Sequence, residues 1–392
     1  MAGKKSISMT VTCPVCLSSI HQQLFDPQDV PVMMHRLYAT AEQARGAQIA
    51  TLDLHRCRSC GFVWNAAFDP TKLQYDESYE NNQGHSKVFW EHMLARADAV
   101  LKAVPPGEPV SYLEVGCGQG TFLTCVAQRA GSRLQSANGF DPAYRGPVTP
   151  PARFYKNYFD RSTAGLLQDR PNVVVSRHTI EHVPDPVTFL RSIRNALGND
   201  SSAAICVETP DVEWIIANGA IQDFFYEHCS IFTPQALDFA LRRSGFQNPR
   251  VERVFGGQYL WAEAHAGSSD AEGLDGGLAE IRNLKSAFIE RWRDRVSAAR
   301  AAGRVALWGA GAKGVTFTLL VDPAGELIDH AVDINPEKQG HFLPISGLPV
   351  ISPAASSSLN PTTIFVMNPL YLGEIADAAA AAGISGELVP IN

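Results

Sequence analysis

The amino-acid sequence predicts an α/β protein in which two strand–glycine turn–helix units follow a small cysteine-bearing unit. Three observations lead to this fold class. An apolar strand breaks into a glycine turn and restarts as a helix over residues 110–127, and the same pattern returns over residues 305–320. Two C-x-x-C pairs stand ahead of both turns. Because alternating strands and helices build parallel sheets, each turn should lie at a sheet edge where ligands bind.

Length and composition narrow the possibilities. A chain of 392 residues with 45% hydrophobic residues is long enough for two or three domains with their own cores. The net charge of −7, without a basic stripe, argues against nucleic-acid binding. No apolar run approaches the roughly 20 residues of a membrane span, and the first residues lack a signal peptide. We therefore expect a cytoplasmic protein, a monomer or homodimer, that binds neither nucleic acid nor membrane.

Residues 1–75 are predicted to form a zinc-binding domain. Four cysteines make two pairs: Cys13 with Cys16, and Cys57 with Cys60. Four thiolates satisfy tetrahedral zinc and leave no position for water, so this zinc would be structural. The spacer, residues 17–56, is longer than in a compact zinc ribbon. Two redox dithiols are the alternative, although the pairs lack the strand–helix setting of that chemistry. His21 and His55 are expected to be bystanders.

Residues 76–107 are predicted to be a lid loop followed by a linking helix. The stretch from Tyr75 to Ser86 is polar and rich in aromatic residues, and it has no period of its own. Such a stretch is either a surface connection or, because it stands just ahead of the first glycine turn, a wall of the ligand site with Tyr79 in it. The helix should end before Pro105 and Pro106.

Residues 108–266 alternate strands with helices and are predicted to form one domain. Its turn contains three glycines: Gly116, Gly118 and Gly120. They let the backbone approach a ligand and leave helix N–H groups pointing at it. Glu114, at the strand end, would repel a pyrophosphate but suits an ammonium or sulfonium centre. Asp141 closes the next strand, where a carboxylate can bind ribose hydroxyls.

A polar linker and a long amphipathic helix occupy residues 267–302 and lead to a Rossmann-like domain at residues 303–392. Its G-x-G-x-x-G turn contains Gly309, Gly311 and Gly314. Lys313 stands in this turn, and no acidic residue precedes it at the strand end, so the turn suits a phosphate or pyrophosphate. Lys313 could instead be a solvated cation at the helix start. The first turn should prefer a cation and the second an anion.

A loop before another predicted helix carries Tyr226, Glu227 and His228 together. The helix should begin after Thr233, with Pro234 at its first position. A titratable pair in a loop beside a ligand site is where catalytic groups are expected.

The E-x-G-x-G-x-G run from Glu114 resembles the first motif of the class I S-adenosylmethionine-dependent methyltransferases. With the cysteine pairs, the Tyr-Glu-His loop and the D-x-N-P-x-K-Q-G run from Asp333, the whole chain resembles the three-part C-methyltransferases of deoxysugar pathways. That resemblance implies a zinc-binding domain, a class I methyltransferase domain, and a C-terminal Rossmann-like domain that helps hold a nucleotide-linked keto sugar. Tyr226 stands where the family usually has a histidine.

The resemblance also implies roles for single residues. Tyr79, Glu227 and His228 would lie at the acceptor. The Rossmann-like domain would contact the acceptor through Gly309, Gly311, Lys313 and Gly314. The methyl donor would be surrounded by Glu114, Gly116, Gly118, Gly120, Asp141, Asn157, Tyr158 and His178. The aromatic residues near Tyr158 would stack on adenine or, alternatively, fill the core.

Carbon methylation requires a carbanion equivalent, which a ketone beside the target carbon makes accessible. His228 is the expected base, because an unperturbed imidazole has a pKa of about 6.5. Glu227 would orient the imidazole or bind a hydroxyl, and Tyr79 or Tyr226 would donate a hydrogen bond to the enolate oxygen. The alternative is that His228 only packs beside Thr233.

The expected partner is a small-molecule acceptor, which could be nucleotide-linked. One alternative is a natural-product tailoring methyltransferase that acts on a heteroaromatic or other non-sugar acceptor. A second is a catalytically inactive binding or assembly protein. A third, an oxidoreductase fusion with NAD at the second turn, is disfavoured because no hydride-transfer residues are evident after Asp333.

Overall fold

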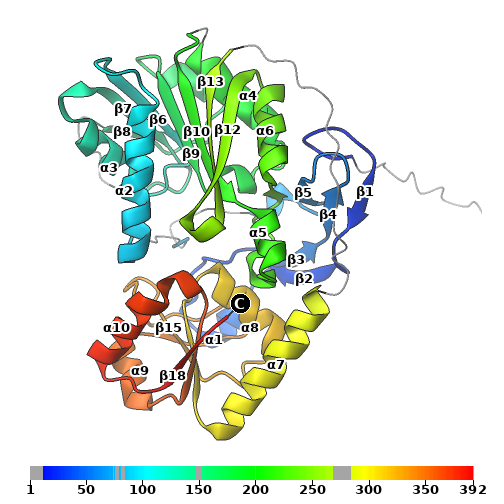
Figure 1. The fold of residues 1–392 in the computed structure, drawn as a ribbon. Coiled ribbons are helices and arrows are strands. Elements are labelled where there is room, and N and C mark those ends of the chain that lie inside the picture. Colours follow the sequence, from blue (N-terminus) through cyan, green and yellow to red (C-terminus); the bar gives the residue numbers. More distant parts are fainter. Residues whose placement is uncertain are drawn as a thin grey trace, which may run out of the picture.

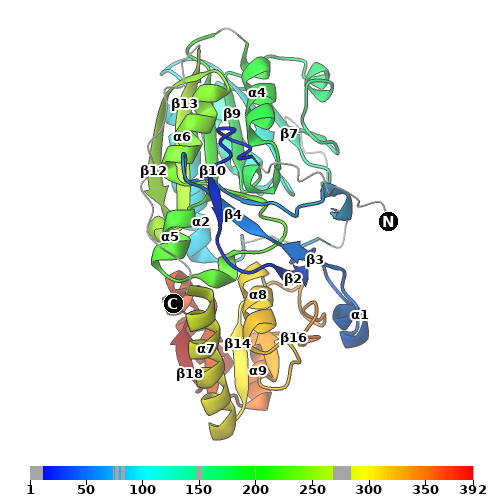
Figure 2. The ribbon, with the colours of Figure 1, turned by 90° about the vertical axis from the view of Figure 1, so that its right-hand side faces the viewer.

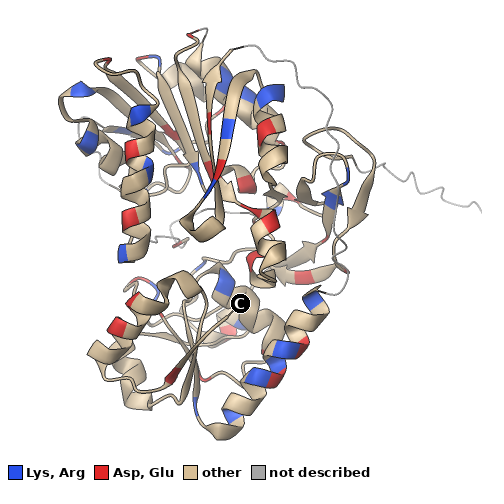
Figure 3. Ribbon diagram, in the orientation of Figure 1, with Lys and Arg blue, Asp and Glu red and all other residues tan. Residues whose placement is uncertain are grey.

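The computed structural model describes residues 12–73, 75, 79–80, 84–146, 152–198, 200–267 and 284–391. Within them, two α/β units are stacked end to end, and an N-terminal unit lies beside their junction (Figure 1). Both signs of charge occur along the helices α2 (Lys87–Lys102) and α7 (Leu284–Ala302) (Figure 3). Among the described residues, no helix has both the length and the apolar character that crossing a membrane requires.

The first α/β unit is built on a seven-stranded sheet of order β12-β13-β10-β9-β6-β7-β8. Its strands are β6 (Val110–Val115), β7 (Leu134–Phe140), β8 (Ala152–Tyr155), β9 (Val173–Arg177), β10 (Ala204–Pro210), β12 (Phe246–Val254) and β13 (Tyr259–Ala266). Strands β6 to β10 are mutually parallel, and β13 runs antiparallel to β10. The chain leaves β6 toward β7 on one side and returns to β9 on the other. This switch point between β6 and β9 is where parallel sheets bind ligands.

Helices cover both faces of this sheet. The helices α2 and α3 (Thr121–Ala130) pack on one face through Phe89, Met93 and Phe122. The helices α4 (Pro186–Leu197) and α6 (Pro234–Arg243) pack on the other through Leu190 and Leu237. The short helix α5 (Val212–Ala217) follows β10 and faces the second unit. The predicted doubly wound α/β architecture is therefore confirmed.

The second α/β unit has a five-stranded, wholly parallel sheet of order β16-β15-β14-β17-β18. Its elements are β14 (Val305–Trp308), α8 (Ala312–Val321), β15 (His330–Val332), β16 (Val350–Ile351), α9 (Pro353–Leu359), β17 (Thr363–Val366), α10 (Leu372–Ala382) and β18 (Glu387–Pro390). Trp292 of α7 and Phe317 of α8 fill one face, and Ile375 of α10 fills the other. Its switch point lies between β14 and β17, beside the second glycine turn.

The N-terminal unit is tied to both α/β units. Its strands β1 (His21–Gln23), β4 (Leu54–Cys57) and β5 (Val63–Asn65) form a sheet that is completed by β11 (Ser230–Ile231), which lies more than a hundred residues later in the chain. The spacer forms the hairpin β2 (Gln28–Pro31) with β3 (Ile49–Leu52) and the helix α1 (Ala41–Arg45). The Ile345 N–H donates to the Ala44 carbonyl at 2.8 Å, so the spacer also docks on the second α/β unit (Figure 2).

Candidate active site

A cavity of about 290 Å³ lies where the carboxyl ends of the two parallel sheets face each other. Residues that follow β9, β14, β15 and β17 line it together with Pro210 at the end of β10, whereas no described residue of the first glycine turn is in the lining. The lining side chains relevant to chemistry are His35, Tyr79, His178, Glu181, His182, His228, Lys313, Asn335 and Lys338. The glycines predicted for the second turn, Gly309, Gly311 and Gly314, are also in the lining.

His228 lies in the wall of this cavity, as the sequence predicted. Its ring packs on Phe225 with the centroids 3.9 Å apart and meets the His182 ring edge-on at 4.9 Å. Burial, with nearby His182, lowers the pKa of His228 well below its ordinary value, so the imidazole is neutral at physiological pH. The pairing of β11 with β5 and the Thr233 cap of α6 fix the backbone just after it. The His228 imidazole is thus neutral and lies at the cavity wall, and its role as a base stays a prediction.

Glu227 is fully buried behind the cavity and does not orient His228 in the way the sequence suggested. Its Oε2 atom accepts the Met34 N–H at 2.7 Å, and no Glu227–His228 hydrogen bond is found in the described part of the chain. Burial raises the pKa of Glu227 to about 7, and the Met34 N–H and the nearby Tyr79 hydroxyl oppose the rise. Glu227 therefore holds the spacer and lies near Tyr79.

The two candidate tyrosines occupy different places. Tyr79 lines the cavity between Tyr75 and His35, with ring centroids at 5.0 and 5.5 Å, and burial raises its pKa well above 10. Its phenol is therefore a proton donor throughout the physiological range. Tyr226 is fully buried outside the cavity lining, and its hydroxyl accepts the Asp69 N–H at 2.8 Å. The structure does not bring Tyr226 to the acceptor site.

Among the cavity residues that the sequence analysis missed are Glu181 and His182. Glu181 and His182 follow β9 at its carboxyl end, and their ligand atoms lie within 4.8 Å of each other and of His228. The Tyr75 hydroxyl is 3.0 Å from His182 Nδ1. The signal was present, because polar residues that directly follow a buried parallel strand face the ligand edge of the sheet.

His178, predicted near the methyl donor, also follows β9 and lines the cavity. Its φ of 49° is in the left-handed region, which is uncommon for a residue with a side chain. Although burial alone lowers its pKa, the carboxylates of Glu181 and Glu208, each 3.6 Å away, raise it to about 9. His178 is therefore a cation balanced by two buried carboxylates.

The first glycine turn forms an open backbone cradle. The Gly118 N–H donates to Asp141 Oδ2 and the Ala143 N–H to Asp141 Oδ1, both at 2.8 Å. No described atom lies within 4 Å of the position that a Gly118 Cβ would take, so the turn leaves room for a ligand. At Gly116, with φ at 78°, a Cβ would stand 1.9 Å from Thr179 Oγ1, so only glycine fits. Gly116 therefore cannot carry a side chain, whereas Gly118 borders open space.

Glu114 lies deeper than the sequence suggested. It is 3% exposed, accepts the Tyr112 hydroxyl at 3.0 Å and does not line the cavity. Burial raises its pKa to about 8, and Arg177 opposes this rise. Burial also raises the pKa of Asp141, which the N–H groups of Ala143 and Gly118 oppose. The turn is thus bordered by one partly buried carboxyl, Asp141, and one fully buried carboxyl, Glu114.

The aromatic segment after β8 divides between core and surface. Phe159 is buried, whereas Tyr158 is 64% exposed and Asn157 is exposed as well. Tyr144 and Phe154 stack on each other at 4.2 Å. Tyr158 therefore does not fill the core and stays available for the predicted stacking on adenine.

The lysines at the second glycine turn are paired with carboxylates. The Ala310 N–H donates to Asp333 Oδ2 at 2.9 Å, and Lys338 Nζ lies 3.7 Å from the same oxygen. Lys313 Nζ is 2.9 Å from Asp223 Oδ2 and 3.3 Å from Gln258 Oε1, both in the first α/β unit. Each lysine is therefore paired with an aspartate, so Lys313 is not simply a solvated cation, and the preference of this turn for an anion stays a prediction.

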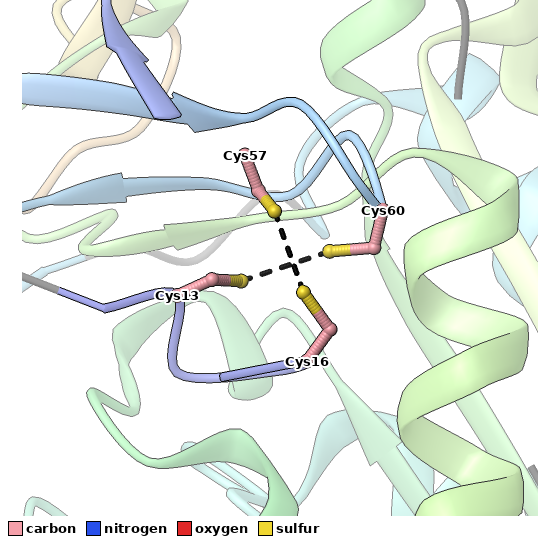
Figure 4. A group of neighbouring side chains, drawn as sticks. All are labelled: Cys13, Cys16, Cys57 and Cys60. Carbon is pink, nitrogen blue, oxygen red and sulfur yellow. Dashed lines mark hydrogen bonds between the residues drawn. The ribbon is translucent and has the colours of Figure 1, made fainter. Parts of the chain in front are cut away.

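The four cysteines of the two C-x-x-C pairs converge on one point (Figure 4). Cys13 Sγ is 3.6 Å from Cys60 Sγ, and Cys16 Sγ is 3.4 Å from Cys57 Sγ. In a tetrahedral zinc site, Zn–S bonds of 2.3 Å separate the sulfurs by about 3.8 Å. The arrangement fits one metal ion bound by four sulfur atoms better than two separate dithiols. His21 and His55 contact each other, with Nδ1 atoms 2.8 Å apart, and are not part of the cluster.

Comparison with known proteins agrees with this geometry. A methyltransferase domain family matches residues 89–251, and the C-methyltransferase C-terminal domain family matches residues 239–389. The chain is 25% identical to the C-methyltransferase NovU of Streptomyces niveus over 371 residues, which covers 87% of this chain and 86% of that protein. These matches support a methyltransferase enzyme, and the families imply S-adenosylmethionine as its methyl donor. More narrowly, they support a C-methyltransferase.

Solved structures resemble the chain more distantly. The CurJ carbon methyltransferase is 15% identical with a TM-score of 0.36, and the alignment covers 47% of this chain and 56% of that one. The N,N-8-amino-8-demethyl-D-riboflavin dimethyltransferase RosA from Streptomyces davawensis is 19% identical with a TM-score of 0.35, over 45% of this chain and 56% of its own.

Proposed function

We propose that the protein transfers a methyl group from S-adenosylmethionine to a carbon beside a carbonyl in a small acceptor, such as a nucleotide-linked keto sugar or a related biosynthetic intermediate. One observation carries this proposal. A neutral imidazole, a protonated phenol and the ends of both parallel sheets share one cavity. We further propose a cytoplasmic enzyme, monomeric or homodimeric, without nucleic-acid or membrane partners.

S-Adenosylmethionine supplies the methyl group when it is bound; the donor residues proposed for it are Glu114, Gly116, Gly118, Gly120, Asp141, Asn157, Tyr158 and His178. An imidazole nitrogen of His228 removes the proton from the acceptor carbon. The imidazole must be unprotonated to act as this general base. The Tyr79 hydroxyl then donates a hydrogen bond to the carbonyl oxygen, where negative charge develops. Glu227, whose pKa the nearby Tyr79 hydroxyl helps to lower, lies behind Tyr79 and holds the spacer through Met34. His178 adds a positive charge at the cavity wall.

A second acceptor class has its own support. The cavity wall contains the rings of Phe225, Tyr259, Trp308 and Tyr371, which suit a flat aromatic molecule. A natural-product tailoring enzyme that methylates a heteroaromatic ring is therefore the second candidate function. In either case, the second glycine turn with Gly309, Gly311, Lys313 and Gly314 would contact the acceptor.

The test is to supply purified protein with S-adenosylmethionine and either nucleotide-linked keto sugars or heteroaromatic acceptors, and to measure the S-adenosylhomocysteine released. Product with the keto sugars supports the first candidate, and product with the rings supports the second. Donor binding without product from any acceptor would favour an inactive binding protein. No binding of donor or product would contradict the proposal.

Replacement of the base is the sharper test. His228→Ala should lower turnover roughly 100-fold or more, because general-base catalysis contributes about that much. Affinity for S-adenosylhomocysteine should not change, since the first glycine turn is untouched. His330→Ala is the matched control, because this histidine is buried beside Ser356, outside the cavity lining. Unchanged turnover in His228→Ala would remove His228 from the mechanism.

We also propose that Cys13, Cys16, Cys57 and Cys60 hold one structural zinc ion, as the sulfur spacings support. Elemental analysis should find one zinc per chain, and Cys57→Ser should lose it together with thermal stability, since structural zinc stabilises the fold that binds it. Cys125→Ser, at a cysteine of α3 outside the cluster, is the control and should keep the zinc. A full zinc content in Cys57→Ser would contradict this assignment.

A further inference from the structure

The two glycine turns are joined by a continuous path of hydrogen bonds that passes through Glu80. Glu80 stands next to Tyr79, and its side chain is almost wholly buried, with the residue 4% exposed. One carboxylate oxygen faces the first α/β unit and the other faces the second. No role follows for Glu80 from the chemistry of methyl transfer itself, because it does not line the cavity.

The first half of the path begins at the methyl-donor turn. Asp141 receives the N–H groups of Gly118 and Ala143. The Gln119 side chain donates to the Ala143 carbonyl and accepts the Arg145 N–H, each at 3.1 Å. The Arg145 guanidinium then reaches Glu80 Oε2 at 2.6 Å and the Tyr79 carbonyl at 3.2 Å. A ligand that settles on this turn therefore contacts the segment that fixes Arg145.

The second half repeats this arrangement in the other unit. Asn335 Nδ2 donates to Glu80 Oε1 at 3.1 Å. The Asn335 N–H donates to Asp333 Oδ1 at 2.9 Å, and Asp333 Oδ2 accepts the Ala310 N–H of the second turn at 2.9 Å. In each unit, the aspartate at the end of the second strand receives an N–H group of the glycine turn. Glu80 is the point at which the two copies of this arrangement meet.

Glu80 also fixes the backbone beside Tyr79. Its N–H donates to the His35 carbonyl at 2.9 Å, and Tyr79 pairs with Arg36 as an isolated β-bridge. Only a carboxylate suits this position, because it accepts hydrogen bonds from both neighbours at once. A glutamine would present one donor and one acceptor, so either the Arg145 or the Asn335 contact would be lost.

We propose that Glu80 is a positioning residue that couples the methyl-donor turn to the second glycine turn. A ligand on the first turn makes Arg145 less mobile. Through its hydrogen bonds, Glu80 then makes Asn335, Asp333 and the backbone around Ala310 less mobile as well. The same contacts fix the position of Tyr79 relative to the donor. Because coupling between sites is reciprocal, a ligand on the second turn must strengthen donor binding by the same factor. This inference rests on the proposed function, in which the first turn binds S-adenosylmethionine.

Hydrogen exchange measured by mass spectrometry tests the coupling with S-adenosylhomocysteine as the only probe. In the unaltered protein, the probe should slow exchange at residues 116–120 and 141–146 and also at residues 309–314 and 333–339. We expect about a fivefold slowing at the distant segments, the lower end of typical coupling between sites. Glu80→Gln and Asn335→Ala should keep the slowing at the first turn and lose it at the second.

Glu374→Gln is the matched control. Glu374 also bridges the two units, since it accepts the Ser86 hydroxyl at 2.8 Å and the Lys87 N–H at 3.2 Å, but it lies outside the path. This variant should keep the slowing at both turns. Slowing confined to the first turn in the unaltered protein, or transmission that survives both Glu80→Gln and Asn335→Ala, would overturn the coupling alone. The absence of any effect of the probe would overturn the proposed function and the coupling together.

Discussion

The two glycine turns share a scaffold and differ in what surrounds it. Each follows the strand at the switch point of its sheet and starts a helix, α3 at Gly120 and α8 at Gly311, without a side-chain cap among the described residues. Each gives one N–H group to the aspartate of the next strand. The four N–H groups at a helix start need partners, so both helices are suited to a ligand.

The backbone and the neighbouring charges separate the two turns. All three glycines of the first turn have positive φ angles, whereas only Gly309 does so among the three of the second. The first turn has carboxyl groups beside it and open space above Gly118. At the second, His35 Cε1 and Lys338 Nζ lie 3.6 and 3.9 Å from the Cβ position of Gly311. Similar turns thus acquire different surroundings from segments distant in sequence.

The largest effect should follow from filling the first turn. Gly118→Val places a side chain in the open space of the turn and strains a backbone with φ at 52°, so it should lower affinity for S-adenosylhomocysteine roughly 100-fold, about 2.7 kcal/mol. Gly311→Ala is the control in the second turn, because its φ of −95° suits any residue. Calorimetric titration measures both, and equal affinities in the two variants would erase the distinction between the turns.

Glu114 offers a test of the charge of the first turn through stability. Its pKa in the folded protein, about 8, lies above its ordinary 4.5, so ionisation is unfavourable in the folded state. The stabilisation from the protonated form is present below about pH 4.5 and is lost as pH rises through about 8. A shift of this size corresponds to a few kcal/mol. Glu114→Gln should therefore melt at a higher temperature than the unaltered protein at about pH 9, with a smaller difference near pH 5.

The same ionisation should affect ligand choice. Above about pH 8, an ionised Glu114 attracts the sulfonium of S-adenosylmethionine but not its neutral product. The ratio of donor affinity to product affinity should thus rise about threefold to tenfold between about pH 7 and pH 9. This is the size of effect expected when one charge, that of Glu114, acts on another, the sulfonium, through the protein. In Glu114→Gln the ratio should stay flat. A ratio that varies equally in both proteins would mean that Glu114 does not sense the donor.

The smallest effect should come from Lys313 in the second turn. Lys313→Met leaves the largely buried Asp223 without its partner. This should lower the free energy of unfolding by about 1–2 kcal/mol. The loss is smaller than is usual for a buried ion pair, because Lys313 is partly exposed. The double variant Lys313→Met with Asp223→Asn should recover most of that loss, which denaturant unfolding would measure. No recovery would indicate that Lys313 stabilises the turn without Asp223 and is free to bind an anion.

The sequence predicted what depends on local pattern. Both glycine turns, the alternation of strands and helices, and the convergence of Cys13, Cys16, Cys57 and Cys60 follow from spacing, and the structure contains them. Through a family resemblance, the sequence also predicted that Tyr79 and His228 lie at the same site.

The remaining features depend on contacts between distant segments. The partner of Lys313, Asp223, lies 90 residues earlier in the chain, so the charge of the second turn could not be read from the turn itself. The contact between Met34 and Glu227 spans 193 residues and brings the spacer between the two cysteine pairs to the wall of the cavity. Tyr226 is directed toward Asp69 rather than the cavity for the same reason. His182 was the exception, since its position after a parallel strand was visible.

The sheet that β11 shares with β5 constrains how the polypeptide reaches this shape on the ribosome. The strands β1, β4 and β5 are made early, but the edge of β5 is paired only by Ser230 and Ile231. The N-terminal sheet is therefore incomplete until those residues have emerged from the exit tunnel. Synthesis must pass His228 before the first unit of the chain can finish folding, so excision of either segment would leave an unpaired strand edge in the other.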